Sequence, residues 1–254
     1  MSLQHDVCGV QMNTDVPDAN GVIWTVRSLS DWVAPDHVQQ IGDATGRPGA
    51  VLLEERHGVH TPSIEGLAFA PTLDAAWAAI NQLNRMPGIG ASGDLVVHES
   101  PSPKSLRVRQ GDVPKSTNPQ PNGLRWLIDY KLTFVALDPY KRSVTAKTAT
   151  IAAGATVSVT NAGNVAASLT FTTTGAGTVI VRQNGTGQIL RTRTSVASGT
   201  TFDSASRRVT TAGGVDIFPM GTPSEWLSIP AASTVTLTNQ GTAPLSAAWY
   251  DTYA

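Results

Sequence analysis

Apolar and polar residues alternate most regularly over residues 125 to 137. Every second position there is apolar: Trp126, Ile128, Tyr130, Leu132, Phe134 and Ala136. The residues between them include Arg125, Asp129, Lys131 and Thr133. Because successive side chains of a β-strand point to opposite faces, this pattern predicts a long, half-buried antiparallel strand. Asp138-Pro139 follows it, and proline lacks the N–H that a strand ladder needs, so we expect the strand to end there.

Shorter β-prone runs precede this strand. We expect one strand and a loop in residues 22 to 33, and two strands around a turn at Gly58 in residues 50 to 69. Two more strands are predicted at residues 94 to 100 and 104 to 112, separated by Pro101-Ser-Pro103, with a loop at residues 115 to 123. These runs indicate a meander of antiparallel strands.

One segment has helical rather than strand periodicity, from Thr72 to Met86. Its apolar positions repeat every three or four residues: Leu73, Ala76, Trp77, Ile80 and Leu83. Thr72 suits the N-cap, Asp74 suits the first turn, and Pro87-Gly88 stops the pattern. We therefore expect one amphipathic helix that packs across a sheet or closes the end of a sandwich.

From Val144 onward the chain holds about eight short strand-like runs punctuated by Gly, Asn and Pro, with no helical period. Such spacing is typical of a β-sandwich or jelly roll. Charge changes at the same place: residues 1 to 150 hold 13 Lys and Arg and 15 Asp and Glu, whereas residues 151 to 254 hold 5 and 4. We predict two domains, residues 1–143 and residues 144–254, with a hinge at Asp138, Pro139 and Tyr140.

Composition excludes several classes of protein. The 254 residues carry a formal net charge of −1, so no surface for coating nucleic acid is indicated. The single cysteine, Cys8, cannot form an internal disulfide and has no metal-ligating neighbours in sequence. No basic and apolar leader begins the chain, and no run approaches the roughly 18 apolar residues of a membrane span. We expect synthesis in the cytoplasm and no membrane insertion.

No motif indicates catalysis, a cofactor or a metal. Gly88 to Gly93 matches G-x-G-x-x-G, but a helix precedes it and a strand follows, the reverse of a phosphate cradle. His57 and His60 lack a third metal ligand at a suggestive spacing, so we interpret them as ordinary surface histidines. Paired glycosidase carboxylates in the second region would have to come from Asp203, Asp216, Glu225 and Asp251. We therefore predict no catalytic, cofactor-binding or metal-binding residues.

The second region does hold candidates for binding. Trp226 and Trp249 lie within alternating strands and are expected in the core, which leaves Tyr250 and Tyr253 as candidates for stacking on a glycan. A subunit interface is predicted at four arginines, because Arg favours interface ion pairs: Arg191, Arg193, Arg207 and Arg208.

Several segments of the chain, in order, resemble the distal tail proteins (Dit) of siphophages. The long strand runs into ALDPYKRS (136–143), and ERHGVHTPSIEGL (55–67) is similar to a strand pair ahead of the family's helix. VTNAGNVAASLTFTTTGAGTVIV (159–181) and the closing EWLSIPAASTVTLTNQGTAPLSAAWYDTYA (225–254) also resemble family segments. Two positions depart from that pattern: Ala167-Ser168 stands where proline is common, and Ala231-Ala232 where glycine is usual.

The resemblance implies a mainly β protein with an N-terminal tail-tube-like β-sandwich flanked by one helix and a C-terminal galectin-like sandwich. It implies a structural, non-enzymatic virion protein that self-assembles into a ring, commonly a hexamer. The ring would join the tail tube, with its tape measure protein, to a hub or fibre protein at the tip of a long non-contractile tail. A contact with host cell-surface glycan is compatible with this role, and lumen-facing carboxylates, drawn from Asp129, Asp112 and Glu99, would keep DNA from sticking. Alternatives are a monomeric carbohydrate-binding or adhesion protein, the tail-tube protein or another baseplate ring protein, and an enzyme.

Overall fold

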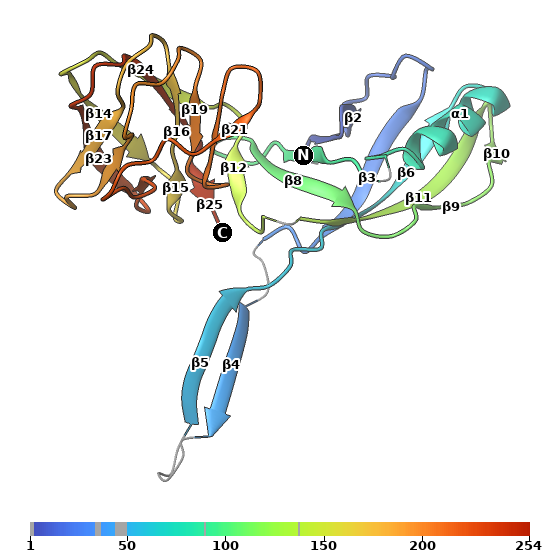
Figure 1. Ribbon diagram of the computed structural model, residues 1–254. Helices are drawn as coiled ribbons and strands as arrows, with labels where there is room; N and C mark the ends of the chain where they lie inside the picture. Colours follow the sequence, from blue (N-terminus) through green and yellow to red (C-terminus); the bar gives the residue numbers. More distant parts are fainter. Residues whose placement is uncertain (1–2, 34–36, 44–49, 89, 137) are drawn as a thin grey trace. The chain divides into compact units, whose positions relative to one another are not determined.

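A computed structural model of the chain describes residues 3–33, 37–43, 50–88, 90–136 and 138–254, and the side chains of residues 34–57 fall outside this description. The chain divides into two compact units, residues 1–141 with residue 254, and residues 142–253. Both units are built almost entirely of β-strands (Figure 1). The mainly β class predicted from the sequence is therefore confirmed.

Seven strands of the first unit form one continuous antiparallel order. That order is β2 (Val10–Met12), β1 (His5–Val7), β7 (Gly93–Val97), β8 (Lys104–Gln110), β11 (Arg125–Val135), β6 (Ser63–Ala70) and β3 (Ile23–Ser30). Two short strands, β9 (Lys115–Ser116) and β10 (Gln120–Asn122), pair with β11 within residues 115 to 123. The prediction of a plain loop there was wrong. The segment is polar and rich in proline, so its sequence does not indicate a strand, but its backbone groups form hydrogen bonds with β11.

The long predicted strand is β11, which pairs with β6 from Trp126 to Thr133. Ile128, Leu132 and Phe134 are fully or almost fully buried in the core of the first unit, so the predicted apolar face is confirmed. Tyr130 shares that face, and its hydroxyl donates to the carbonyl oxygen of Thr25 at 3.0 Å. Gly66 lies opposite, where an added Cβ would come within 2.5 Å of that hydroxyl oxygen. The close approach of β6 and Tyr130 therefore requires glycine.

The predicted helix is α1 (Leu73–Leu83), the one α-helix of the described residues. The Thr72 hydroxyl caps it by accepting from the Ala75 N–H at 3.1 Å, as expected. The buried face differs from the prediction: Trp77 is 46% exposed, whereas Ala79 is fully buried. Small side chains at Ala76 and Ala79 let the helix axis come close to the sheet, and Leu83 is buried beside them as predicted. Leu73 and Trp77 are the large apolar residues of the helix that turn outward.

Strands β4 (His37–Asp43) and β5 (Ala50–His57) form a separate two-stranded antiparallel sheet. In Figure 1 no third strand lies beside either of them. The strand at β5 was expected from the sequence, but β4 was not. An isolated two-stranded hairpin is marginally stable in water, so its free edges are suited to pairing with another chain.

The second unit holds two larger sheets. One has the order β13 (Lys147–Ile151), β24 (Leu245–Trp249), β16 (Thr170–Thr173), β19 (Thr201–Asp203), β20 (Arg208–Thr210) and β21 (Asp216–Ile217). The other has the order β14 (Thr156–Asn161), β23 (Ser233–Asn239), β17 (Ile180–Asn184) and β18 (Ile189–Arg191). A short pair, β15 (Ala167–Ser168) with β22 (Ser228–Ile229), completes them, and β12 (Lys141–Ser143) and β25 (Thr252–Tyr253) are the first and last strands of this half of the chain.

One apolar cluster fills the second unit and includes Phe171, Phe202, Leu237 and Leu245, all fully buried. Trp249 belongs to this cluster and Trp226 packs against it, so the expectation that both serve the core is confirmed. The alternate positions facing out from β14 and β23 are hydroxylic, and Thr160 and Thr234 meet at 2.8 Å between their hydroxyl oxygens. Both units thus have a core of their own.

Candidate interaction surfaces

The predicted hinge residues lie just before the point where the chain passes from the first unit to the second. The Tyr140 N–H donates to the Asp138 carboxylate at 3.2 Å, which closes a local turn after β11. The carbonyl oxygen of Pro139 lies 3.2 Å from Nδ1 of His60. This segment is therefore tied to the first unit by named contacts.

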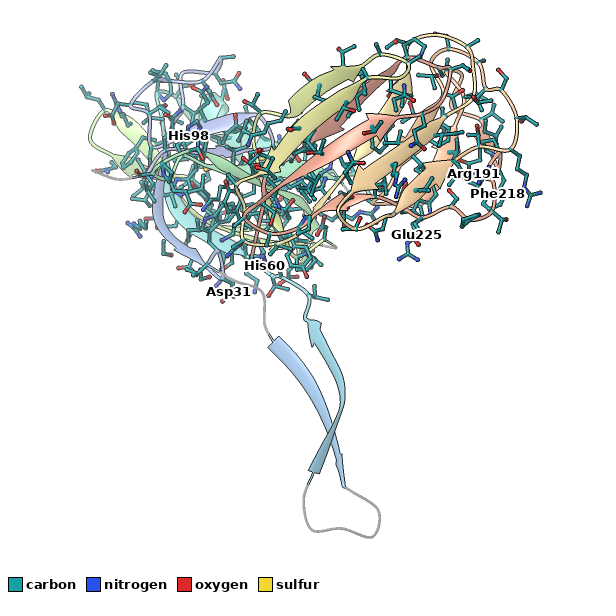
Figure 2. The ribbon with its side chains drawn as sticks, turned by 90° about the vertical axis from the view of Figure 1, so that its left-hand side faces the viewer. Asp31, His60, His98, Arg191, Phe218 and Glu225 are labelled. Carbon is teal, nitrogen blue, oxygen red and sulfur yellow. The ribbon has the colours of Figure 1, made fainter. Side chains whose placement is uncertain are left out.

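His60 is almost fully buried, and its other ring nitrogen contacts the carbonyl oxygen of Asp31 (Figure 2). Both ring nitrogens thus lie against backbone carbonyl oxygens of distant segments. The interpretation of His60 as a surface histidine was therefore wrong, because these segments fold over the ring and bury it. The side chain of His57 lies outside the described residues. No group of three His, Cys, Asp or Glu side chains suited to a metal ion occurs in the described part of the chain.

Lys141 reinforces the same region. Its ammonium donates to the carbonyl oxygens of Trp32 at 3.1 Å and Val33 at 2.6 Å, and it lies 5.4 Å from the centre of the Trp32 ring. Burial is the main cause that lowers the pKa of this amine, against the field of Glu99, which raises it. Lys141 thus holds the chain that enters β4 against the chain that leaves β11.

The three carboxylates predicted as lumen candidates all lie in ion pairs. Asp129 pairs with Arg27 at 3.1 Å, Glu99 with Lys104 at 3.0 Å, and Asp112 with Lys115 at 3.8 Å. A hollow of about 370 Å³ over β3, β6, β9 and β11 is lined by such charges, including Arg27, Glu65, Lys115, Asp129 and Lys131. Mixed charge of this kind gives the face little net field, and its orientation towards a lumen stays a prediction.

Cys8 lies in a closely packed site. It lies against Gly93, where an added Cβ would meet its sulfur at 2.4 Å. Burial, and then the nearby carboxylates of Asp94 and Asp6, raises the pKa of this thiol to about 11. A thiol so hard to ionise is a poor nucleophile at neutral pH.

The predicted context of the Gly88 to Gly93 motif is confirmed, since α1 precedes it and β7 begins at Gly93. Ile89, inside the motif, lies outside the described residues. The described chain also contains no helix long and apolar enough to cross a membrane.

The four arginines predicted as a subunit interface gather at one place in the second unit. A hollow of about 200 Å³ is lined by Arg193 and Arg207, together with Phe218, Met220, Gly221, Thr222, Ser224 and Trp226. A second hollow of about 320 Å³ is lined by Arg207, Arg208, Val209, Asp216, Ile217 and Phe218. Arg191 lies beneath Gly221, whose added Cβ would come within 3.4 Å of the Arg191 Nε. Sequence reasoning missed Phe218, which is 83% exposed.

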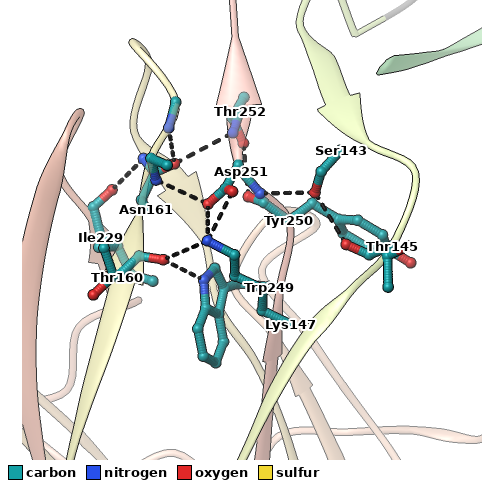
Figure 3. A network of polar contacts seen from close by, with 12 residues as sticks. Ser143, Thr145, Lys147, Thr160, Asn161, Ile229, Trp249, Tyr250, Asp251 and Thr252 are labelled. Carbon is teal, nitrogen blue, oxygen red and sulfur yellow. Dashed lines mark hydrogen bonds and ion pairs between the residues drawn. The ribbon is translucent and has the colours of Figure 1, made fainter. Parts of the chain in front are cut away.

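Of the two tyrosines predicted to stack on a glycan, Tyr250 lies beside a buried polar network (Figure 3), and Tyr253 follows that network in the sequence. Tyr250 is 39% exposed and Tyr253 is partly exposed. Between them the buried Asp251 accepts from the Lys147 ammonium at 2.9 Å and from the Ala162 N–H at 2.9 Å. The network anchors the chain around the tyrosines, and their role in glycan binding stays a prediction.

The four carboxylates of the second region have structural partners or face solvent. Asp216 binds Arg208, Asp251 binds Lys147, and Asp203 accepts from the Ser206 hydroxyl at 2.6 Å. Glu225 is exposed.

No family model matches the chain, and no curated protein matches it. Solved structures do resemble it. The crystal structure of the SPP1 Dit protein (gp 19.1), described as a paradigm of the hub adsorption apparatus in phages that infect Gram-positive bacteria, has a TM-score of 0.70 and 16% identity, with 100% of both chains covered.

Chains of the phage P2 baseplate in its activated conformation are also similar. The structure with Ca gives a TM-score of 0.58 at 10% identity over 100% of this chain and 99% of that one. The structure with Sr gives 0.52 at 11% identity over 97% and 98%. The resemblance to distal tail proteins inferred from the sequence is thus confirmed at the level of the fold: from end to end, this chain has the fold of a phage Dit hub protein.

Proposed function

We propose that this chain is a structural protein of a phage tail that assembles into a ring, a hexamer, joining the tail tube to the hub or fibre at the tail tip. The observation that carries the proposal is the likeness to the SPP1 Dit protein, which extends over the full length of both chains. A fold shared in both units supports a shared architectural role more strongly than a match to one unit would.

The edges of β4 and β5 support self-assembly, because this pair joins no other strand of the described chain. The end strands β2 and β3 are less available, since Asn13, just after β2, donates from its backbone N–H to the Trp24 carbonyl of β3 at 2.9 Å. A ring needs a heterologous contact, in which one surface of a subunit binds a different surface of the next and the rotation closes. Strand edges give such a contact directional hydrogen bonds.

The proposal places the chain in the virion, assembled in the host cytoplasm, with no enzymatic activity. The first unit forms the ring and the second, a galectin-like sandwich, faces outward. The tail tube, its tape measure protein and the hub or fibre protein are the proposed neighbours.

Mass photometry and negative-stain electron microscopy of the purified full chain, over a range of concentrations, test the ring. We expect particles with the mass of six chains and a central hole. Replacing residues 37 to 57 by a short Gly-Ser linker removes β4 and β5 and should abolish these particles while circular dichroism still reports folded β-sheet. A wild-type chain that stays strictly monomeric, also after chemical cross-linking at high concentration, would contradict the proposal.

A further inference from the structure

The two hollows of the second unit share Arg207 and Phe218, so they form one continuous surface, which we call the arginine–phenylalanine surface. Figure 2 shows Arg191 and Phe218 on the same side of this unit. The backbone beneath it is well anchored. Arg193 N–H donates to the Pro219 carbonyl at 2.8 Å, and Gly221 N–H donates to the Arg191 carbonyl at 2.9 Å. The side chains thus stand on a fixed frame.

Positive charge is concentrated here. Residues 151 to 254 contain five Lys and Arg residues, and all except Arg182 lie at this surface. Arg208 is neutralised by its ion pair with Asp216. Arg191, Arg193 and Arg207 have no carboxylate partner among the described residues. Two further acids lie in the same segments: Asp203, opposite Arg208 in the β19–β20 pair, and the exposed Glu225. A charge-poor unit therefore presents an excess of cations at one place.

Two further features indicate a ligand. The Nε of Arg191 is buried without a hydrogen-bond partner in the described structure, and it lies directly under Gly221, a residue that lines the smaller hollow. Buried hydrogen-bond donors normally have an acceptor, so an unpaired donor beside a hollow is available to bind a ligand. Phe218 stands 83% exposed between the hollows, and Trp226 forms part of one wall. An aromatic side chain exposed to water beside guanidinium groups is unfavourable in free energy unless a ligand covers it.

We propose that the arginine–phenylalanine surface binds an anionic glycan, a saccharide or polyol chain that carries carboxylate or phosphate groups. Guanidinium groups bind both kinds of oxyanion in a bidentate geometry. The aromatic rings offer apolar faces to the carbon skeleton, and the hydroxyls of Thr222 and Ser224 offer polar contacts. Two small adjacent hollows suit successive units of a repeating chain better than a protein interface, which needs a larger continuous area.

The inference does not depend on ring formation, because all its residues lie within the second unit. It is tested on the full chain by isothermal titration calorimetry with two charged probes, oligogalacturonate for carboxylate and a glycerol-phosphate oligomer for phosphate. A neutral maltooligosaccharide is the control probe. We expect at least one charged oligomer to bind, more weakly as salt is added, and the neutral oligomer not to bind.

Arg193→Ala combined with Arg207→Ala should weaken this binding at least tenfold, since it removes both unpaired guanidinium groups of the smaller hollow. Phe218→Ala should weaken binding and leave its salt dependence in place. The matched control is Arg182→Ala, an exposed arginine on β17 outside both hollows, which should change affinity less than twofold. Circular dichroism and urea unfolding verify that each variant is folded.

Two outcomes would overturn the inference. One is a failure of binding to depend on these arginines: neither charged oligomer binds at millimolar concentration, or both bind the double variant with the affinity of the wild type. The other is that the double variant loses self-association, measured by mass photometry, while charged oligomers do not bind. That result would assign the arginines to a subunit interface, as the sequence interpretation has it, and would leave the ring intact as a proposal.

Discussion

Ala232 adopts a backbone conformation that favours glycine, with φ of +46°. It lies in the turn between β22 and β23, at the position where the distal tail family usually has glycine. A side chain with a Cβ costs about 1 kcal/mol or more in the left-handed region. The departure from the family pattern noted in the sequence is thus a local strain that the rest of the turn tolerates.

Ala232→Gly should therefore stabilise the second unit by about 0.5–1 kcal/mol, because glycine removes the steric cost but adds entropy to the unfolded chain. The measurement is the midpoint of urea unfolding. Ala231→Gly is the matched control, since Ala231 is not in the left-handed region, and it should lower stability slightly. Equal effects of the two substitutions would contradict this account.

His5 makes the stability of the first unit depend on pH. It is 4% exposed in β1, and burial lowers its pKa, with a smaller contribution from the field of His98. The unfolded chain therefore binds a proton more readily than the folded one. Stability from this group is fully present above the unfolded pKa of about 6.5 and is lost as the pH falls towards the lower, folded pKa.

We expect unfolding of the wild type to become easier between pH 7 and pH 5, and His5→Gln to reduce that dependence. Urea titrations at several pH values measure the difference. His98→Gln leaves the buried ring of His5 in place and should therefore reduce the pH dependence less. An identical pH dependence in wild type and His5→Gln would rule out this role for His5.

At the scale of elements, two strands of the second unit end in the same way. β14 ends at Asn161 and β23 at Asn239, and each asparagine is followed two residues later by a glycine whose N–H donates to the asparagine Oδ1, at 2.9 Å from Gly163 and 3.0 Å from Gly241. Each Nδ2 donates in turn to backbone carbonyls beyond its own turn, such as that of Val165 at 2.7 Å from Asn161. These hydrogen bonds connect the ends of β14 and β23 to the segments that follow them.

Asn161→Ala should lower the free energy of unfolding of the second unit by about 2 kcal/mol or more, because it leaves several buried backbone groups without partners. Asn184→Ala is the control, since this exposed amide donates to the Thr238 hydroxyl at 3.0 Å and its loss should cost less than about 0.5 kcal/mol. Chemical unfolding of both variants provides the comparison, and a cost for Asn161→Ala as small as the control's would refute the assignment.

At the scale of the whole molecule, we predict that residues 1–143 and 144–254 are separable folding units. Each unit has its own buried cluster, and Val144, between β12 and β13, is 44% exposed. Elastase, which cleaves after small apolar residues, should cut near residues 140 to 155 and release a stable fragment of the second unit, detected by mass spectrometry. If that segment stayed protected until both cores were digested, the two units would unfold as one.

The sequence alone was sufficient to predict the elements in which buried residues recur at a regular spacing. The alternation of β11, the N-cap at Thr72 and the short strands after Val144 are local patterns, and the chain itself carries them. The order and spacing of the same segments also pointed to the distal tail fold. These features are predictable because side-chain direction is set by backbone geometry within a few residues.

Other features exist only through contacts between distant segments. β9 and β10 are strands because β11 lies beside them, and α1 buries Ala79 rather than Trp77 because the sheet admits only a small side chain there. The arginine–phenylalanine surface joins residues 191 to 193, 207 to 208 and 216 to 226. No local period links these positions, so the sequence could propose the arginines but not the exposed Phe218. Periodic burial was therefore encoded locally, whereas the candidate binding surface was decided by tertiary structure, which alone brings such segments together.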